Sequence, residues 1–164
     1  MCDNTYIPLM PSALQKELRQ TRPFTSLEQE ASLSVERTAA VLRHAIAEAL
    51  RGFGITPAQY NVLRILRGAG EGGLCRHEVA DRLVTQVPDV TRLLDRMEEG
   101  GLVVRERSAE DRRLVSTRVT SQGLALLDRI DEPMARLHER QLAHLTPEQL
   151  RTLIDLLALV RQSE

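Results

Sequence analysis

The chain has very few aromatic residues and no tryptophan. Two tyrosines and two phenylalanines are the only aromatic residues among its 164 amino acids. A core must therefore be built from leucine, valine, isoleucine and alanine, and the length is sufficient for one packed domain or a small domain with helical extensions. This composition favours a fold rich in α-helix.

Cysteine is scarce, and long hydrophobic runs are missing. Cys2 and Cys75 show no CxxC spacing, which excludes a disulfide framework. The N-terminus lacks the basic and apolar regions of a signal peptide, and apolar runs such as Leu156 to Val160 are far too short to cross a bilayer. We therefore expect a soluble, cytoplasmic protein that does not associate with membranes.

An excess of charge of one sign is also missing. The 22 basic and 23 acidic residues give a net charge of −1, which argues against a protein that coats nucleic acid without selectivity. Lys16 is the only lysine, so nearly all basic residues are arginines. Arginine suits phosphate and guanine, but a GC-rich genome explains the same bias, so this feature alone identifies no partner.

Motifs for catalysis or metal binding are not recognisable. The segment Gly68 to Gly73 is not followed by the Lys-Ser/Thr of a phosphate-binding loop. His138 and His144 are six residues apart and do not share a helical face, and Cys75 with His77 has no evident further ligands. Cys75 is either a redox-sensitive thiol or a small residue at a capping position, and we favour the second. The sequence thus predicts no enzyme, metal or cofactor.

The N-terminal half begins with an arm and a long helix. Residues 1–25 contain three prolines, so only Ser12 to Gln20 could form two helical turns. Over 26–54 apolar residues recur at steps of three and four, which predicts an amphipathic helix ended by Gly52 and Gly54. The residues of this apolar stripe are Val35, Ala39, Leu42, Ile46, Ala49, Leu50 and Phe53.

The central part predicts a helix followed by a helix-turn-helix. Thr56-Pro57 with Gln59 forms a capping box for a helix that extends to about Arg67. A short helix is expected from Cys75 to about Leu83, and after a brief turn Pro88 is expected to open another that ends at Gly100-Gly101. Two short helices joined by so tight a turn describe a helix-turn-helix.

A β-hairpin and two helices complete the pattern. Val103–Arg107 and Leu114–Thr120 alternate between apolar and polar residues, which predicts two strands. A helix from Ser121 to about Leu145, bent at Pro133, precedes a last helix capped by Thr146. The terminal helices carry more apolar surface than so small a core can cover, which favours a two-fold homodimer.

The predicted fold is mainly α with a small β-hairpin wing (α+β). We expect a winged helix-turn-helix with N- and C-terminal dimerisation helices. The predicted domains are an arm at 1–25, a dimerisation helix at 26–54, a DNA-binding domain at 55–120 and C-terminal dimerisation helices at 121–164.

In this order of elements the chain resembles the MarR family of bacterial regulators. The matching segments are Ile55 to Leu63 (ITPAQYNVL), Glu78 to Leu83 (EVADRL), Val90 to Glu98 (VTRLLDRME), Gly101 to Val103 (GLV), Arg105 to Ser108 (RERS), Asp111 to Arg113 (DRR) and Val119 to Gly123 (VTSQG). The resemblance covers about 35–160 and is most specific over 89–113. It implies a homodimeric winged-helix repressor of a palindromic operator in double-stranded DNA.

A recognition helix presents its N-terminal residues and one polar face to the major groove. The candidates for DNA contact are Thr85, Gln86, Asp89, Thr91, Arg92 and Arg96. The alternative is a solvated face on which Arg92 pairs with Asp89. In the wing, the resemblance implies that Asp111 orients Arg113 into the minor groove, and Arg112 could contact a phosphate. We expect Glu98, Glu99 and Glu106 to point away from the DNA.

The resemblance further implies release by a small, often aromatic, acid bound between the DNA-binding lobe and the dimerising helices. Arg43, His44, Ala47 and Tyr60 are candidate lining residues, although a helix that merely lines a core gives the same pattern. The alternative function is a winged-helix module that binds a protein, without sequence-specific DNA binding.

Overall fold

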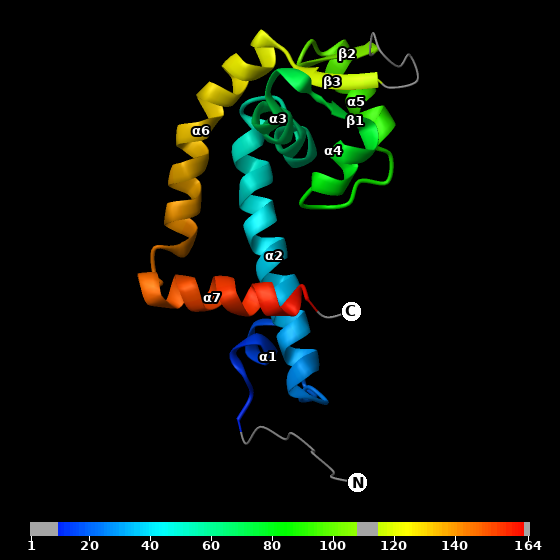
Figure 1. Cartoon of the computed structure of the whole chain (residues 1–164). Helices are drawn as coiled ribbons and strands as arrows, with labels where there is room; N and C mark the ends of the chain where they lie inside the picture. Colours follow the sequence, from blue (N-terminus) through cyan, green and yellow to red (C-terminus); the bar gives the residue numbers. More distant parts are fainter. Residues whose placement is uncertain (1–9, 108–114, 163–164) are drawn as a thin grey trace. The chain divides into compact units, whose positions relative to one another are not determined.

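The computed structural model describes residues 10–107 and 115–162, and its elements are labelled in Figure 1. The chain divides into two units, Met1–Ala45 and Ile46–Glu164. The first unit contains α1 (Ala13–Glu17) and the greater part of α2 (Leu27–Arg51). The second unit contains α3 (Pro57–Ala69), the 3-10 turn η1 (Gly70–Gly72), β1 (Leu74–Cys75), α4 (Arg76–Arg82), α5 (Val90–Glu99), β2 (Val103–Arg107), β3 (Val115–Val119), α6 (Ser121–Leu142) and α7 (Pro147–Val160).

The first unit contains a short helix where the sequence predicts at most two turns. The Ser12 hydroxyl accepts a hydrogen bond from the Gln15 amide at 3.2 Å and so begins α1. Glu17 forms an ion pair with Arg37 of α2, with 2.7 Å between Oε1 and Nε. Phe24, between the two helices, is buried. The described part of the predicted arm is therefore attached to α2.

The helix boundaries follow the predicted caps, with two corrections. The Thr56 capping box is present, with hydrogen bonds of 2.9 and 3.3 Å to and from Gln59. Phe53 lies beyond the end of α2 rather than within it, in a turn closed by its own N–H bond to the Leu50 carbonyl. Pro88 does not open α5, because Asp89 is the N-cap residue and the helix begins at Val90.

The β-hairpin is present, but it belongs to a three-stranded antiparallel sheet. The strand order is β1-β3-β2, with Leu74 opposite Thr117 and Val103 opposite Val119. Strand β1 is not predictable from the sequence, because two residues are too few to show an alternating pattern. This extra strand joins the start of α4 to β3 at Ser116 and Thr117.

The core of the second unit lies where α3 packs against α6, β3 and α4. This core is mainly aliphatic, as predicted. The four buried apolar side chains of α5 belong to it. Tyr60 and Leu124, two residues assigned to inward stripes, are half-buried and exposed respectively. The fully buried side chains are Leu50, Val62, Leu63, Leu66, Val79, Leu94, Met97, Leu127 and Ile130, with Thr117 from β3.

The junction between the sheet and α6 depends on Thr120. Its hydroxyl accepts a hydrogen bond from the Gly123 amide at 3.1 Å and donates one to the Gly101 carbonyl at 2.6 Å. A Cβ on Gly123 would lie 2.4 Å from the Leu102 carbonyl oxygen, so only glycine permits this close approach. The start of α6 is thereby tied to the turn that follows α5.

We expect Thr120→Ala to lower the free energy of unfolding by about 1–2 kcal/mol, because it removes a helix cap and a second hydrogen bond. Urea denaturation monitored by circular dichroism measures this loss. Thr120→Ser, which keeps the hydroxyl, is the control and should retain most of the stability. An equal loss in both variants would contradict the assigned role of the hydroxyl.

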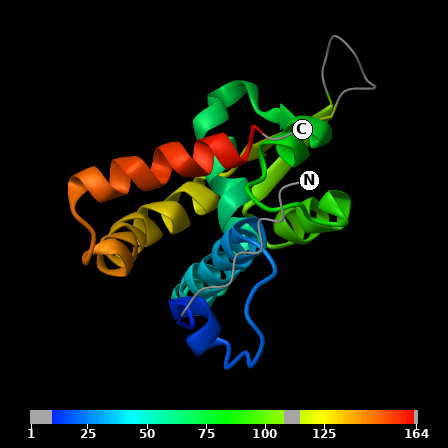
Figure 2. The same ribbon diagram turned by 90° about the horizontal axis from the view of Figure 1, so that it is seen from below.

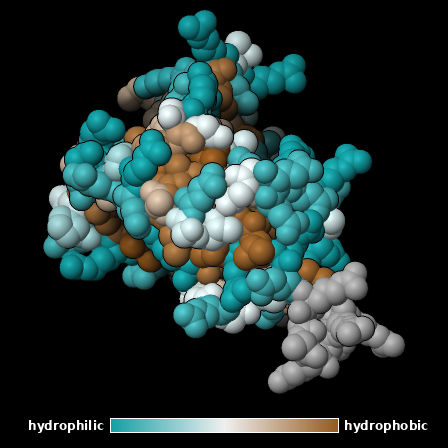
Figure 3. All heavy atoms as spheres, turned by 90° about the horizontal axis from the view of Figure 1, so that it is seen from above, coloured by the Kyte–Doolittle hydropathy of each residue, from teal (hydrophilic) through white to brown (hydrophobic). Residues whose placement is uncertain are grey.

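Helix α6 runs away from the sheet and ends at Leu142. The chain then changes direction sharply before α7, as Figures 1 and 2 both show. No described residue of α7 is buried. Ile154 and Leu159 are each 62% exposed. On the face of the molecule shown in Figure 3, hydrophobic patches are exposed among hydrophilic residues. Within the described part of the chain, no helix combines the length and hydropathy needed to span a membrane.

Candidate nucleic-acid interface

Helix α5 presents three distinct faces. Val90, Leu93, Leu94 and Met97 are buried, and they hold the helix on the core. Thr91, Arg92 and Arg96 are exposed. Asp95 and Glu98 lie on a third face and contact β2 through Arg105. The helix therefore offers one free polar face with a hydroxyl group and two guanidinium groups, which ends at the exposed carboxylate of Glu99.

Asp89 acts on the helix itself. One of its carboxylate oxygens accepts the Arg92 amide at 2.9 Å, and the other lies 3.3 Å from Arg92 Nε. The Arg92 side chain is nevertheless 78% exposed, so the pair is a solvated contact of low energy. Arg96 Nε donates to the Arg92 carbonyl at 3.3 Å. Asp89 thus caps the N-terminus of α5 and orients the Arg92 side chain.

Thr85 and Gln86 are exposed in the turn between α4 and α5. The turn is anchored from α3, where Asn61 Oδ1 accepts the Val84 amide at 2.9 Å. This role of Asn61 is not visible in the sequence, because its hydrogen-bond partner is 23 residues away. This hydrogen bond holds the start of the turn that contains Thr85 and Gln86 and leads to the N-cap residue Asp89.

The base of the hairpin is described, whereas Asp111, Arg112 and Arg113 lie outside the described residues. Arg118 of β3 pairs with Glu106 of β2, at 2.5 Å between Nη2 and Oε2. Arg105 pairs with Asp95 and Glu98 of α5. The Arg105 guanidinium group lowers the pKa of Glu98 below its usual value. Glu98 and Glu106 therefore form ion pairs with arginines of the hairpin.

Cys75 occupies the N-cap position of α4. The Glu78 carboxylate accepts hydrogen bonds from the Cys75 amide at 2.8 Å and from its thiol at 2.9 Å. Burial, and then the hydrogen bond to Glu78, raises the pKa of the Cys75 thiol. A raised pKa disfavours the reactive thiolate. This arrangement favours the structural interpretation of Cys75 over a redox role.

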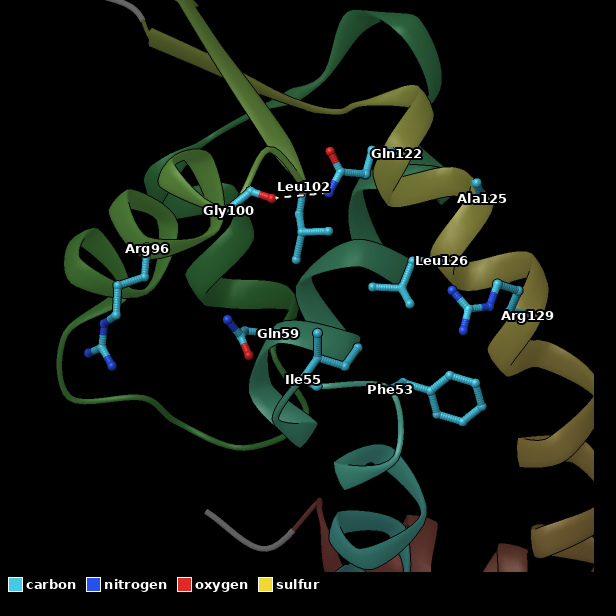
Figure 4. Close-up of a pocket in the computed structure, with 11 residues that line it drawn as sticks. Phe53, Ile55, Gln59, Arg96, Gly100, Leu102, Gln122, Ala125, Leu126 and Arg129 are labelled. Atoms are coloured by element: carbon cyan, nitrogen blue, oxygen red, sulfur yellow. Dashed lines mark hydrogen bonds between the residues drawn. The ribbon is translucent and has the colours of Figure 1, made fainter.

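A hollow of about 470 Å³ lies between the start of α3, the turn after α5 and the first turns of α6 (Figure 4). Among the described residues, its lining contains two arginines and two glutamines but no carboxylate. The Arg129 guanidinium lies 6.0 Å from the centre of the Phe53 ring. The lining residues are Phe53, Gly54, Ile55, Gln59, Arg96, Gly100, Leu102, Gln122, Ala125, Leu126 and Arg129.

None of the four predicted pocket residues lines this hollow. Arg43 and His44 are exposed on α2, and Ala47 is half-buried on the same helix. The Tyr60 ring of α3 lies 5.8 Å from the Arg64 guanidinium. The hollow is not visible in the sequence, because its lining comes from three separate segments of the chain, 53–59, 96–102 and 122–129.

An ion pair connects α3 to α6. Arg67 donates to both carboxylate oxygens of Asp131, at 2.7 and 3.0 Å. The hydrogen bond to Arg67 lowers the pKa of Asp131. A bidentate pair of this kind fixes the angle between two groups as well as their distance. Helix α6 is thus held to the helix-turn-helix lobe at a second point besides Thr120.

Comparison with known proteins agrees with this geometry. A model of the MarR family matches residues 53–114. A MarR transcription factor from Planctomyces limnophilus is 43% identical, with a TM-score of 0.64 over 83% of this chain and 98% of that one. A mutant MarR from E. coli, complexed with operator DNA, is 25% identical, with a TM-score of 0.74 over 91% and 99%.

Among the curated proteins, the transcriptional repressor MdtR of Bacillus subtilis is 27% identical over 124 residues, which are 76% of this chain and 79% of MdtR. These relatives are transcription regulators rather than enzymes. The winged-helix fold predicted from the sequence is confirmed. The chain therefore belongs to the MarR family of transcription regulators.

Proposed function

We propose that this protein is a homodimeric repressor that binds a palindromic operator and is released from it by a small anionic ligand. The observation that carries the proposal is the free polar face of α5, where Thr91, Arg92 and Arg96 are exposed while the opposite face is buried. The named repressor MdtR and the operator complex of E. coli MarR support DNA as the partner. A DNA-bound regulator acts in the cytoplasm.

In this mode α5 enters the major groove with its N-terminal end. Arg92 and Arg96 bind guanine or phosphate, and Thr91 and the adjacent Thr85 and Gln86 donate to phosphate or base edges. In the wing, Asp111 orients Arg113 into the minor groove and Arg112 binds a neighbouring phosphate. Asp89 contributes by capping the helix and steering Arg92.

The proposed homodimer presents two such surfaces to one face of the DNA. Half-sites one helical turn apart, about 34 Å, require the two copies of α5 to have a matching separation. The apolar residues left exposed on α7 and α2 supply the contact between the two chains. They are Leu27, Val35, Val41, Leu153, Ile154, Leu156, Leu159 and Val160.

Binding to duplex DNA at two salt concentrations tests this proposal. Selection from random duplexes identifies the preferred sequence, and fluorescence anisotropy then measures affinity for it at 50 and 200 mM salt. We expect a palindrome and a fall in affinity of about 0.9 log units per phosphate contact per log unit of salt. A flat response without sequence preference would instead support the protein-binding module.

The hollow is the proposed effector site. The Arg129 guanidinium, two amides and the apolar side chains of Ile55, Leu102 and Leu126 suit an anion with an apolar body, such as an aromatic carboxylate, whereas the Arg96 side chain points away from them (Figure 4). Arg96 belongs both to the hollow and to the exposed face of α5. A ligand that turns Arg96 toward the hollow therefore competes with the operator for the same side chain.

We expect benzoate, used as a simple aromatic carboxylate, to weaken operator binding by the wild type at millimolar concentration. Arg129→Gln should need several times more benzoate, because Arg129 lines the hollow without belonging to α5. Arg136→Gln is the control, since Arg136 lies further along α6 and pairs with Glu132. An identical response in all three proteins would exclude the hollow as the effector site. Arg43, His44, Ala47 and Tyr60 would then be the next residues to replace.

A further inference from the structure

Arg105 differs from the arginines of the exposed α5 face because it is engaged within the protein. Its Nε and Nη2 donate to Glu98 Oε2 at 2.8 and 2.6 Å, and Nη2 lies 2.7 Å from Asp95 Oδ1. The Arg105 backbone amide donates to Glu98 Oε1 at 3.0 Å. Its side chain is 27% exposed, against 78% for Arg92. We name Arg105, Asp95 and Glu98 the wing clamp.

The wing clamp changes the charge that α5 presents. Between Val90 and Glu99 the helix carries three carboxylates and only two arginines. A net negative helix is unfavourable beside DNA, because phosphates repel it. Arg105 lies against two of the three carboxylates and adds one positive charge, which brings the net charge of the helix and its partner from −1 to zero. Asp95 and Glu98 are thereby partly neutralised at the contact with β2, on a different face from Arg92 and Arg96.

The wing clamp also fixes the orientation of the hairpin relative to α5. Asp95 and Glu98 are one helical turn apart on α5, so a guanidinium group bound to both cannot rotate freely about either. Arg105 is in the middle of β2, and β2 is paired with β3 along its whole length. The hairpin and α5 therefore keep one relative orientation, which two adjacent grooves of DNA require for simultaneous contact.

We propose that Arg105 is a positioning residue for operator recognition, which acts through Asp95 and Glu98 and does not itself contact DNA. The inference rests on the proposed function of α5 as the recognition helix. It implies that sequence preference depends on the clamp, whereas sequence-independent attraction to phosphates depends on the exposed arginines. Loss of the clamp thus lowers specific binding selectively.

The test compares Arg105→Met, Glu98→Gln and the double variant by anisotropy on the selected operator and on a random duplex. We expect each single variant to bind the operator about tenfold more weakly, the equivalent of one lost base contact. Binding to the random duplex should change by less than binding to the operator in each variant, and the double variant should be no weaker on the operator than the weaker single variant. Thermal unfolding verifies that each variant is folded, and Asp95→Asn replaces any variant that is not.

Glu98→Gln is the decisive variant, because it removes a negative charge near DNA. If Arg105 contacted phosphate directly, Glu98→Gln would free it, and operator binding would stay equal or tighten; that result overturns the inference. Glu106→Gln makes the same charge change on β2 but faces Arg118, and should alter affinity by less than about twofold. A wild type without operator preference would instead overturn the proposed function, and the inference with it.

Discussion

Replacing Arg92 and Arg113 together by alanine is expected to abolish detectable preference for the operator while leaving the protein folded. Arg92 is in the first turn of α5 with an exposed side chain, and Arg113 belongs to the predicted wing. Each lost base contact costs about 1–3 kcal/mol, and a two-fold dimer loses each contact twice. The expected loss of operator affinity for the double variant is therefore about 4 kcal/mol or more.

Anisotropy at several salt concentrations measures this effect and separates the two residues. Arg92→Ala should relax the sequence preference within each half-site, whereas Arg113→Ala should act on the flanking base pairs where the wing reaches the minor groove. Arg151→Ala on α7 is the control, since this exposed arginine lies outside the proposed DNA-binding surface. Unchanged operator affinity in both single variants would refute the assignment of α5 and the wing to DNA.

Introducing charge on the apolar face of α7 is expected to convert the proposed dimer to a monomer and to eliminate tight operator binding. Ile154 and Leu159 are each 62% exposed, and no described residue of α7 is buried. Aspartate at both positions would have to be buried without a partner in a dimer contact, which is costly. A monomer binds only one half-site, so the affinity for the operator should fall by a factor of about 10²–10⁴.

Sedimentation equilibrium measures the oligomeric state of the Ile154→Asp/Leu159→Asp variant, and circular dichroism its helix content. Thr152→Asp is the matched control, because it adds a charge to the same helix at an exposed polar position. We expect the control to remain dimeric and to bind the operator. A double variant that stays dimeric would place the interface elsewhere, and a wild type that is monomeric would remove the dimer from the proposal.

The elements could be predicted from local patterns because local physics determines them. Thr56 and Thr146 form capping boxes in the structure, and Thr120 caps α6, each from a hydroxyl group three residues before the amide that it binds. The apolar spacing of α5 likewise identified its buried face. The start of α5 was misplaced by two residues, because Asp89 competes with Pro88 as the first helical signal.

In the candidate site, too, some residues could be predicted from local patterns and others could not. Thr91, Arg92 and Arg96 could be selected because helical periodicity separates them from the buried residues. The role of Asp89 as a cap, and the anchoring of the turn by Asn61, were not recognised. The engagement of Arg105 by α5 was also invisible in the sequence, because any of several carboxylates could have been its partner.

The amino-acid sequence alone therefore determined the long helices, the two strands of the hairpin, most of the helix caps, and to which family the chain belongs. Short-range hydrogen bonds and apolar periodicity specify these features within a few consecutive turns. The tertiary structure decided the pairing of β1 with β3, the lining of the hollow and the contact of Arg105 with Asp95 and Glu98. Each of these joins residues from separate elements, and only the packing of those elements brings them together.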